Sequence, residues 1–368
     1  MTKKLLVTAS TWGHIRSFHL PYLLEFQRLG WEVHVGCAGI PADSPHVDKA
    51  IELPFEKKMQ SPANLRALGL LRKSVREERY DRIVTHTSLA AFFTRFAVKG
   101  MVDRPKVINV VHGYLFDDET PAAKRRLLLT AERLCAAETD LLLTMDQWDR
   151  ETAGRYRLGK RIESIPGMGV DFARLDRATE EDGRGLRERL GLPADAFVLL
   201  YPAEFSERKS QQVLIRAMAR LPERVVLALP GSGALQGDCR ALADSLGLQG
   251  RILFPGQIED MGPWYRMADA AVASSRSEGL PFNVMEALHA ELPVIASRVK
   301  GHVDLITDGE NGLLYPYGDA SSCASCVERL LSDAALRERL ENRAATSVER
   351  YRLERVLPEV MEAYLSQL

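Results

Sequence analysis

The sequence predicts an α/β protein made of two doubly wound, Rossmann-like domains. Short apolar runs typical of buried parallel strands alternate with segments of helical periodicity, beginning with a strand–turn–helix–Gly–strand unit over residues 4–36. The alternation stops over the charged, weakly patterned stretch 176–194 and then restarts. At 368 residues the chain is also long for one domain. We expect domains at 1–180 and 191–350, followed by a helix at 351–368.

Each predicted element rests on its local pattern. In the first half, apolar runs predict strands at 4–9, 31–36, 81–86, 106–111, 140–145 and 161–165. Helical spacing predicts helices at 19–29, where Gly30 ends the helix, and at 63–78, 88–99 and 122–137. In the second half the predicted strands are 197–201, 224–229, 251–254, 269–274, 292–297 and 312–315. Helices are expected at 184–190, 211–221, 234–246, 261–268, 283–290, 320–331, 335–351 and 353–368.

Composition restricts the classes of partner. The formal charge is −1, so nothing global favours nucleic acid. Residues 55–107 carry 12 basic and 5 acidic side chains, which favours either an anionic membrane surface or a phosphorylated acceptor, with a solvated face as the alternative. No window approaches 18 apolar residues, and the first apolar run is too short for a signal peptide.

Five scattered cysteines are an odd number without a disulfide framework, which favours a reducing cytoplasm. Together with the basic segment, this predicts a cytoplasmic protein that contacts the inner face of the plasma membrane peripherally.

The stretch 274–286 carries the main chemical signal. A predicted strand leads through a loop containing Glu278, Gly279 and Leu280 into a predicted helix that includes Glu286. Apart from Pro281, backbone N–H groups from Gly279 to Asn283 (those of Leu280 and Phe282 included) can hold phosphate or sugar oxygens at a helix start. The two carboxylates can accept hydrogen bonds from hydroxyl groups, Glu286 from a ribose diol. The combination indicates a sugar nucleotide, whereas the alternative is an ordinary strand-to-helix turn.

Other polar residues also follow predicted strands. Ligands bind outside the carboxyl ends of parallel strands, so these loops are candidate positions, and with two such sheets we expect the site in the cleft between the domains. The candidates are Gly13, His14, His86, His112, Tyr114, Lys209, Gly231 and Gly233. Turn-capping or packing roles are the alternative for His14, His86, His112 and Tyr114.

Lys209 can neutralise a pyrophosphate leaving group as a point charge. The chain contains no Asp-x-Asp sequence, which argues against a diphosphate site bridged by metal. We therefore expect neither a metal ion nor a cofactor, with the nucleotide sugar acting as co-substrate.

Taken together, these motifs resemble the retaining family 4 glycosyltransferases of GT-B fold. The resemblance rests on Ser-Glu-Gly-Leu-Pro-Phe-Asn-Val-Met-Glu-Ala at 277–287, on 292–297 and on Asn-Gly-Leu-Leu at 311–314. His-Ile-Arg-Ser-Phe-His-Leu-Pro-Tyr at 14–22, Val-His-Gly-Tyr at 111–114 and Ile-Pro-Gly-Met-Gly-Val-Asp at 165–171 resemble the bacterial exopolysaccharide and capsule branch. The resemblance covers nearly the whole chain.

The resemblance implies roles at the matching positions. Glu278 would contact donor-sugar hydroxyls, Glu286 the ribose and Lys209 the pyrophosphate. His112 would lie near the donor sugar and the acceptor. Gly13 and His14 would approach the phosphates, Gly231 and Gly233 would flank the nucleotide, and Arg251 and Ile252 would pass the base. It also implies that the last helix crosses back to the N-terminal domain.

One position departs from the family pattern. Many relatives carry an arginine five residues before the lysine, where this chain has Glu204. Either Arg208 replaces that arginine or the phosphate site uses one cation. His86 and Tyr114 are the acceptor-side candidates.

The predicted activity is transfer of a sugar with retention from a nucleotide diphosphate sugar. We expect a UDP-sugar, UDP-N-acetylhexosamine among them, and a polyprenyl-diphosphate-linked or oligosaccharide acceptor in surface polysaccharide synthesis. The alternatives are a UDP-sugar 2-epimerase of the same fold and a non-catalytic two-domain sugar- or nucleotide-binding protein.

Overall fold

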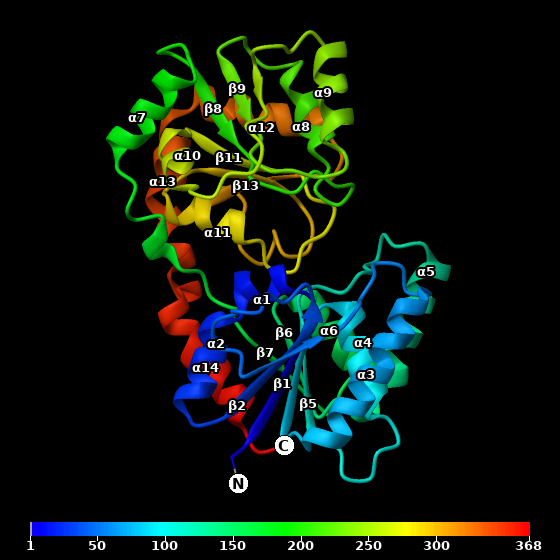
Figure 1. Cartoon of the computed structure of the whole chain (residues 1–368). Helices are drawn as coiled ribbons and strands as arrows, with labels where there is room; N and C mark the ends of the chain where they lie inside the picture. Colours follow the sequence, from blue (N-terminus) through cyan, green and yellow to red (C-terminus); the bar gives the residue numbers. More distant parts are fainter. Residues whose placement is uncertain (1) are drawn as a thin grey trace. The chain divides into compact units, whose positions relative to one another are not determined.

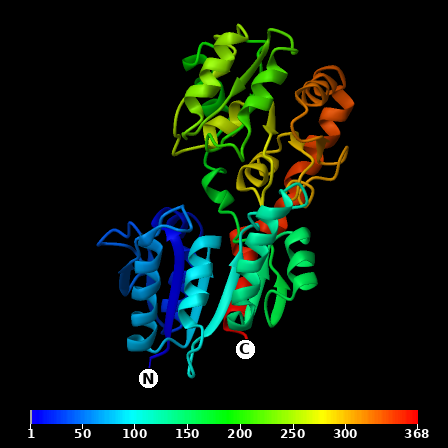
Figure 2. The ribbon, with the colours of Figure 1, turned by 90° about the vertical axis from the view of Figure 1, so that its right-hand side faces the viewer.

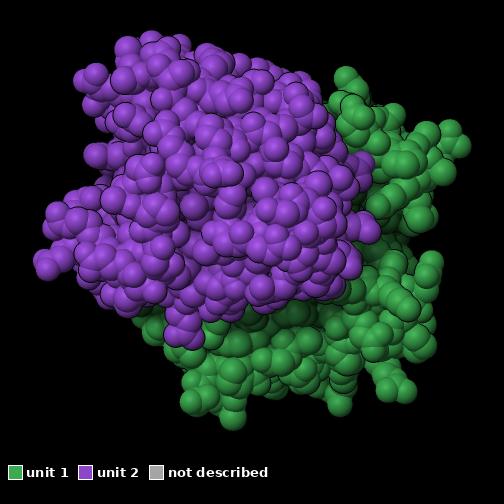
Figure 3. All heavy atoms as spheres, turned by 90° about the horizontal axis from the view of Figure 1, so that it is seen from above, with its two compact units in different colours: residues 1–169, 354–368 green, residues 170–353 purple. Residues whose placement is uncertain are grey.

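The computed structural model describes residues 2–368 and divides them into two compact units, which Figure 3 colours separately. Unit 1 contains the chain up to Gly169 together with Glu354–Leu368, and unit 2 contains Val170–Leu353. The sequence had placed the first domain's end at residue 180 and a linker at 176–194. Instead, Thr179 and Asp182 form a capping box that starts a helix, α7 (Glu180–Arg189), which packs on α10 (Gly262–Met267). These residues therefore belong to unit 2.

Unit 1 is built on a seven-stranded parallel sheet with the order β3-β2-β1-β4-β5-β6-β7. Its strands are β1 (Lys4–Thr11), β2 (Glu32–Ala38), β3 (Lys49–Glu52), β4 (Arg82–His86), β5 (Lys106–Val111), β6 (Leu141–Thr144) and β7 (Arg161–Ser164). The central strands are buried almost along their whole length, as expected where helices cover both faces of a parallel sheet.

The helices of unit 1 cover its sheet as Figures 1 and 2 show, with α3, α4 and α5 on one face and α2 and α14 on the other. They are α1 (Trp12–Phe18), α2 (Leu20–Arg28), α3 (Pro62–Glu78), α4 (Ser88–Val98), α5 (Ala122–Cys135), α6 (Gln147–Tyr156) and α14 (Leu353–Leu365), with a 3-10 turn at Ala136–Glu138. Three of the observed strands and α-helices of unit 1, α1, α6 and β3, were not predicted. The Trp-Gly-His sequence suggested a turn where α1 forms, and β3 is a largely exposed edge strand without apolar alternation.

The C-terminal helix α14 packs on unit 1 through aromatic rings and a basic side chain. The ring of Tyr364 stacks on Phe26 with centroids 6.1 Å apart and meets Tyr22 edge-on. The guanidinium of Arg82 donates hydrogen bonds to the carbonyl oxygens of Tyr364 and, at 2.8 Å, Ser366. Residues at opposite ends of the sequence are thereby joined in one unit.

Unit 2 repeats the same architecture with six parallel strands in the order β10-β9-β8-β11-β12-β13. The strands are β8 (Phe197–Leu200), β9 (Val225–Ala228), β10 (Ile252–Leu253), β11 (Ala270–Ala273), β12 (Val294–Ser297) and β13 (Gly312–Tyr315). The remaining helices are α8 (Gln211–Met218), α9 (Gln236–Ser245), α11 (Phe282–His289), α12 (Ala320–Ser332) and α13 (Ala334–Val348), with 3-10 turns at Phe172–Arg174 and Glu349–Tyr351. The predicted α/β class with two doubly wound sheets is confirmed.

Both sheets reverse their strand order at an internal point, and this locates the candidate sites. The reversal falls between β1 and β4 in unit 1 and between β8 and β11 in unit 2. Loops diverge at the carboxyl ends of such strands and leave a crevice in which ligands bind. In unit 1 those ends are followed by His14 and Thr87, and in unit 2 by Lys209 and Glu278.

A buried ion pair between α4 and α5 predicts a large stability difference. Arg95 is fully buried, and its guanidinium donates to Glu132 at 2.9 Å and to the Ala91 carbonyl at 3.0 Å. We expect Glu132→Leu to lower the free energy of unfolding by about 3–5 kcal/mol, because it leaves a buried cation without its carboxylate. Urea denaturation would measure this.

The matched control is Glu77→Leu on α3, whose carboxylate pairs with Lys73 at the surface. It should cost less than about 1 kcal/mol. Equal losses for the two variants would contradict the assignment of Arg95 and Glu132 as a stabilising pair.

Candidate active site

In unit 2, the site centres on the buried carboxylate of Glu278, which follows β11. Its Oε1 accepts hydrogen bonds from Lys209 Nζ at 2.6 Å and Ser275 Oγ at 2.5 Å, and its Oε2 accepts one from Arg208 at 2.5 Å. Lys209 and Arg208 come from the loop after β8, the neighbouring strand across the reversal point. The fold thus brings together one carboxylate and two cations that are about seventy residues apart in the chain.

The charges of this cluster follow from its contacts. Burial alone raises the pKa of Glu278, but Lys209 and Arg208 outweigh it and lower that pKa to about 2. The carboxylate is therefore ionised at neutral pH, and the three side chains together carry a net charge of +1. Such a cluster attracts an anion while its own buried charge stays compensated.

Glu286, the second glutamate, lies in the first turns of α11 and is held by two residues that were not predicted. Its Oε2 accepts from Tyr265 Oη at 2.9 Å and its Oε1 from Arg174 at 2.9 Å. Burial raises the pKa of Glu286, whereas Tyr265 and Arg174 oppose that shift. The two partners fix the orientation of the carboxylate and leave it further lone pairs, which is what binding of a hydroxyl pair requires.

The loop between the two glutamates is shaped by close backbone approaches. Gly301 has φ +81°, and a Cβ there would lie 2.4 Å from the carbonyl oxygen of Gly279, so no larger residue fits against this loop. Pro281 caps α11, and the loop leads through Leu280 and Phe282 to Asn283, whose side-chain amide donates to the Pro202 carbonyl at 3.1 Å. The backbone amides in the first turn of a helix have no carbonyl acceptor within that helix.

Gly231 and Gly233 lie in the loop after β9, beside the loop after β8. A Cβ on Gly231 would come within 2.1 Å of the Ala203 carbonyl oxygen at φ +138°, so this glycine lets the two loops pass each other. Glu204 follows Ala203, which Gly231 approaches, and precedes Phe205, which Gly233 approaches; its side chain is exposed. Because Arg208 already contacts Glu278 beside Lys209, it supplies the second cation that Glu204 cannot.

Arg251, which the resemblance implies would pass the base, does not join this cluster. Its guanidinium donates to the carbonyl oxygens of Leu221, Pro222 and Val225 at 2.9–3.2 Å. These carbonyls lie at the amino end of β9, the opposite edge of the sheet from Glu278. Ile252 is a buried core residue of β10. Both residues therefore stabilise the sheet at the start of the strand that the sequence predicted at 251–254, and their place beside the base came from the resemblance alone.

In unit 1, the carboxyl ends of β1, β4 and β5 bring together His14, His86 and His112. His86 Nδ1 lies 3.1 Å from His112 Nε2, and the rings of His14 and His112 meet edge-on with centroids 4.7 Å apart. Burial lowers the pKa of His14 to about 4 and the pKa values of His86 and His112 well below the usual value. Neutral imidazoles therefore line this edge, and Gly13 is exposed in the first turn of α1 next to them.

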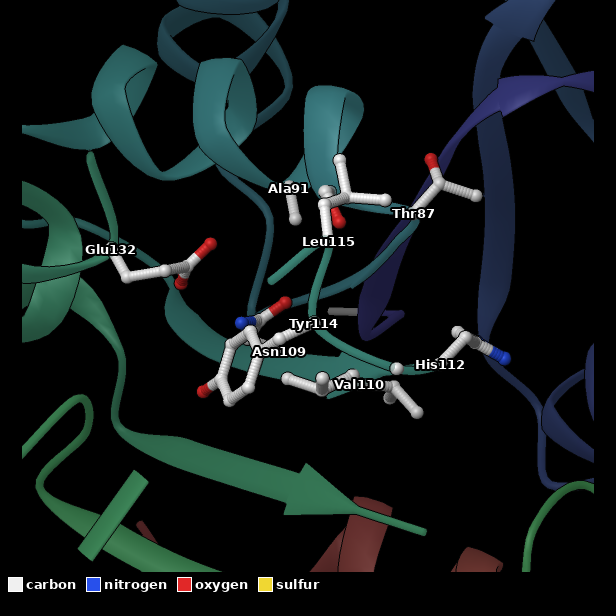
Figure 4. A pocket seen from close by; sticks show the side chains of 11 residues that line it. Thr87, Ala91, Asn109, Val110, His112, Tyr114, Leu115 and Glu132 are labelled. Atoms are coloured by element: carbon white, nitrogen blue, oxygen red, sulfur yellow. The ribbon is translucent and has the colours of Figure 1, made fainter. Parts of the chain in front are cut away.

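A cavity of about 180 Å³ adjoins His112. Figure 4 shows Thr87 and His112 on one side of it and Glu132 on the other, with Tyr114 and Asn109 between them. Tyr114 is buried and stacks on Phe116, so it packs as well as lining the cavity.

Thr87, which links His86 to α4, has φ 61°, an unusual value for a β-branched residue. Its hydroxyl accepts a hydrogen bond from the Ser10 amide at 3.0 Å and so holds this conformation. Such local strain is often found at functional sites.

Four residues that position the predicted site residues were not themselves predicted: Ser275, Tyr265, Arg174 and Thr87. Ser275 could have been found, because it follows the predicted strand and precedes Glu278 by three residues. Arg174 and Tyr265 carry no local signal, since Arg174 is 112 residues from the glutamate it contacts.

The Glu278 cluster predicts a specific pH dependence of stability. The pKa of Glu278 in the folded protein is about 2 and its ordinary value is 4.5, so its contribution is fully present above pH 4.5 and is lost as pH falls towards 2. Between pH 5 and pH 3 the difference in free energy of unfolding between the wild type and Glu278→Gln should shrink by about 2 kcal/mol. Urea denaturation at several pH values would measure it.

The control is Glu204→Gln, an exposed carboxylate in the loop that carries Lys209. The difference between wild type and this control should change by less than about 0.5 kcal/mol over the same pH range. A flat profile for Glu278→Gln would show that Lys209 and Arg208 do not hold the buried carboxylate in its ionised form.

Comparisons with known proteins address the whole chain. The family model described as "Glycosyl transferase 4-like domain" matches residues 22–167, and the one described as "Glycosyl transferases group 1" matches residues 184–347. EpsD of Bacillus subtilis (strain 168), whose name describes it as a glycosyltransferase, is 34% identical over 369 residues, covering 99% of this chain and 97% of EpsD.

Two further proteins are more distant. The UDP-Gal:alpha-D-GlcNAc-diphosphoundecaprenol alpha-1,3-galactosyltransferase of Escherichia coli is 24% identical over 83% of this chain and 80% of its own length. The crystal structure of Anabaena HepE in complex with UDP and glucose has the same fold, with a TM-score of 0.81, 19% identity and coverage of 99% of this chain and 100% of HepE.

The family models that match the two halves describe glycosyltransferases, and the relative that aligns from end to end is named as one. The two alternatives, an epimerase and a non-catalytic binding protein, are therefore set aside. The chain belongs to the family 4 glycosyltransferases of GT-B fold.

Proposed function

We propose that this enzyme transfers a sugar, with retention of anomeric configuration, from a UDP-sugar to a lipid-linked or oligosaccharide acceptor in surface polysaccharide synthesis. The observation that carries the proposal is the pairing of Glu278 with Lys209 and Arg208, with Glu286 in the helix that follows Glu278. It supplies cations for a diphosphate and carboxylates for sugar and ribose hydroxyls in one unit.

The donor would be held by unit 2. Lys209 and Arg208 would turn from Glu278 towards the diphosphate, which frees the lone pairs of Glu278 to accept from hydroxyls of the transferred sugar. Glu286, oriented by Tyr265 and Arg174, would accept from the ribose diol. Backbone amides of Gly279, Leu280, Phe282 and Asn283 would bind remaining oxygens, and the Gly231–Gly233 loop would flank the nucleotide. The base would lie near the carboxyl end of β10 rather than at Arg251.

Transfer needs no protein nucleophile in this proposal. The acceptor hydroxyl oxygen forms a bond to the anomeric carbon on the face from which the diphosphate leaves, and the bond from that carbon to the phosphate oxygen breaks. The proton of the acceptor passes to the departing phosphate. Lys209 and Arg208 stabilise the charge that develops on the diphosphate, so no metal ion or cofactor is required. His112 would assist near the donor sugar and acceptor, with Gly13 and His14 approaching the phosphates.

The acceptor would be bound by unit 1. The cavity lined by His112 and Tyr114, with His86 next to His112, offers polar and apolar surface at the edge where this sheet reverses its order. The E. coli relative is named for a diphosphoundecaprenol acceptor and the HepE structure contains UDP, which supports a lipid-linked acceptor and a uridine donor. UDP-N-acetylhexosamines are among the donors to be tested first.

A donor screen tests this proposal. Purified protein would be heated with UDP-, GDP- and ADP-sugars, and binding read as an increase in Tm. We expect UDP-sugars to raise Tm, and Glu286→Ala to weaken UDP binding at least tenfold in calorimetry, because the ribose loses its acceptor.

The control for that variant is Glu291→Ala, an exposed carboxylate just after α11. It should bind UDP as the wild type does. Unchanged UDP affinity in Glu286→Ala would remove the donor-site assignment, and inversion at the anomeric carbon in the NMR spectrum of the product would remove the retaining mechanism.

We also propose that unit 1 contacts an anionic membrane surface through α5. None of the helices described over residues 2–368 meets the length and apolarity needed to cross a bilayer. On α5, Leu127 and Leu134 are 68% and 49% exposed, and Lys124, Arg126 and Arg133 are exposed around them. Exposed leucines flanked by cations fit a helix that lies in the plane of a membrane interface. The cysteines of the described chain are free and buried, which supports a cytoplasmic location at the inner face.

Vesicle binding tests this surface. The double variant Leu127→Ser with Leu134→Ser should bind at least several-fold less to vesicles containing anionic lipid, measured by cosedimentation, because it removes the apolar contact. The control Leu246→Ser changes an exposed leucine after α9 in unit 2 and should bind as the wild type does. Equal binding by all three proteins would rule out α5 as the contact.

A further inference from the structure

Four histidines of unit 1 form a compact cluster, here called the histidine quartet: His14, His19, His86 and His112. One ring nitrogen from each lies within 4.8 Å of the corresponding nitrogen of every other. They come from α1, the residue before α2, the end of β4 and the residue after β5. Segments distant in the sequence thus deliver four imidazoles to one point.

The quartet contains ring nitrogens that the rest of the described chain does not satisfy. Neither nitrogen of the fully buried His19 has a hydrogen-bond partner among residues 2–368, and neither does Nε2 of His14. In contrast, both ring nitrogens of the buried His34 have hydrogen-bond partners, Tyr80 at 2.8 Å and Glu32 at 2.7 Å. Buried polar atoms are normally satisfied, so the open nitrogens of the quartet call for a ligand.

A second cluster serves as an internal comparison. Glu32, His34 and Glu78 also bring three ligand atoms close together. There, however, Lys4 contacts both carboxylates, and Lys49 pairs with Glu78 at 2.5 Å. Ammonium groups already neutralise that cluster, whereas no lysine or arginine forms an ion pair or hydrogen bond with the quartet in the described chain.

The composition of the quartet selects the class of ligand. Imidazole nitrogens suit Zn²⁺, Cu²⁺ and Ni²⁺, whereas Mg²⁺ and Ca²⁺ prefer oxygen. Tetrahedral zinc with Zn–N bonds of about 2.0–2.1 Å places its nitrogens roughly 3.3 Å apart. His86 Nδ1 and His112 Nε2 are already 3.1 Å apart. The rings of His19 and His86 stack at 3.7 Å, so coordination requires them to tilt until both lone pairs meet the ion.

We propose that the histidine quartet binds one first-row transition metal ion, with Zn²⁺ as the best match. The ion would satisfy the open nitrogens of His14 and His19 and would occupy Nε2 of His112. The transfer proposed above uses no metal ion, and because His14 and His112 take part in it, an ion bound to His112 would inhibit that transfer. The inhibitory part rests on the proposed function, but the binding part does not.

Metal binding is tested on the full chain without donor or acceptor. Protein stripped with a chelator is dialysed against Zn²⁺, its zinc content is measured by mass spectrometry, and affinity is measured by competition with a chromogenic chelator. We expect one equivalent of zinc and a higher Tm. His19→Asn and His14→Gln should each weaken binding at least about tenfold, since losing even an outer partner of a ligand costs 10–100-fold.

The control is His46→Gln, which changes a histidine of unit 1 that contacts Gln27 outside the quartet. It should bind zinc as the wild type does. His14 is only partly buried, so His14→Gln provides a second test should His19→Asn unfold. Co²⁺ in place of Zn²⁺ should give the visible absorption of a tetrahedral nitrogen site in the wild type and not in the quartet variants.

The proposal is overturned if the wild type retains much less than one equivalent, or if His14→Gln and His46→Gln bind zinc equally. In the presence of an active donor and acceptor, Zn²⁺ should inhibit transfer by the wild type, and a chelator should restore it. Undiminished transfer by zinc-loaded protein would overturn the inhibitory part alone. Absence of transfer under all conditions would count against the proposed function and leave the zinc measurement intact.

Discussion

The structure of unit 2 depends on a buried carboxylate that is compensated by two cations. Glu278 accepts hydrogen bonds from Lys209, Arg208 and Ser275, and these contacts keep its pKa at about 2 despite burial. Without them, a buried negative charge at the reversal point of the sheet would be costly. The same contacts hold two cations beside each other at the reversal point. One cluster therefore stabilises the loops after β8 and β11, and in the proposed function its two cations would bind the diphosphate.

Unit 1 has the same strand topology, but the side chains at its reversal point are neutral and not charged. Its reversal point is lined by neutral imidazoles, because burial lowers the pKa values of His14, His86 and His112 and no carboxylate opposes that shift. A neutral edge offers lone pairs and no net charge. Two sheets of like strand order thus present different chemistry at their reversal points, which the proposed function would use for the acceptor in unit 1 and the donor in unit 2.

Strand ends could be predicted from the sequence, but contacts across the sheet could not. Glu278, Lys209 and His112 were found because each follows an apolar run, and parallel strands place such residues at one edge. The place of Arg251 beside the base came from the resemblance alone, whereas the predicted strand at 251–254 already put Arg251 at the amino end of that strand. The boundary was misplaced because the capped helix α7 is polar, and only its packing on α10 assigns it to unit 2. His19 was not among the candidates named from the sequence, because its cluster is visible only in three dimensions.

Glu286 illustrates why those unpredicted contacts matter for function. Burial favours its protonated form, which would donate a hydrogen bond where a ribose diol needs acceptors. Arg174 and Tyr265 oppose protonation by donating to each oxygen at 2.9 Å. Because Arg174 is half-exposed, its guanidinium loses little hydration in this contact, whereas a buried cation would need further partners. In the proposed contact with the ribose, the glutamate named by the sequence motif would thus depend on two residues outside the motif.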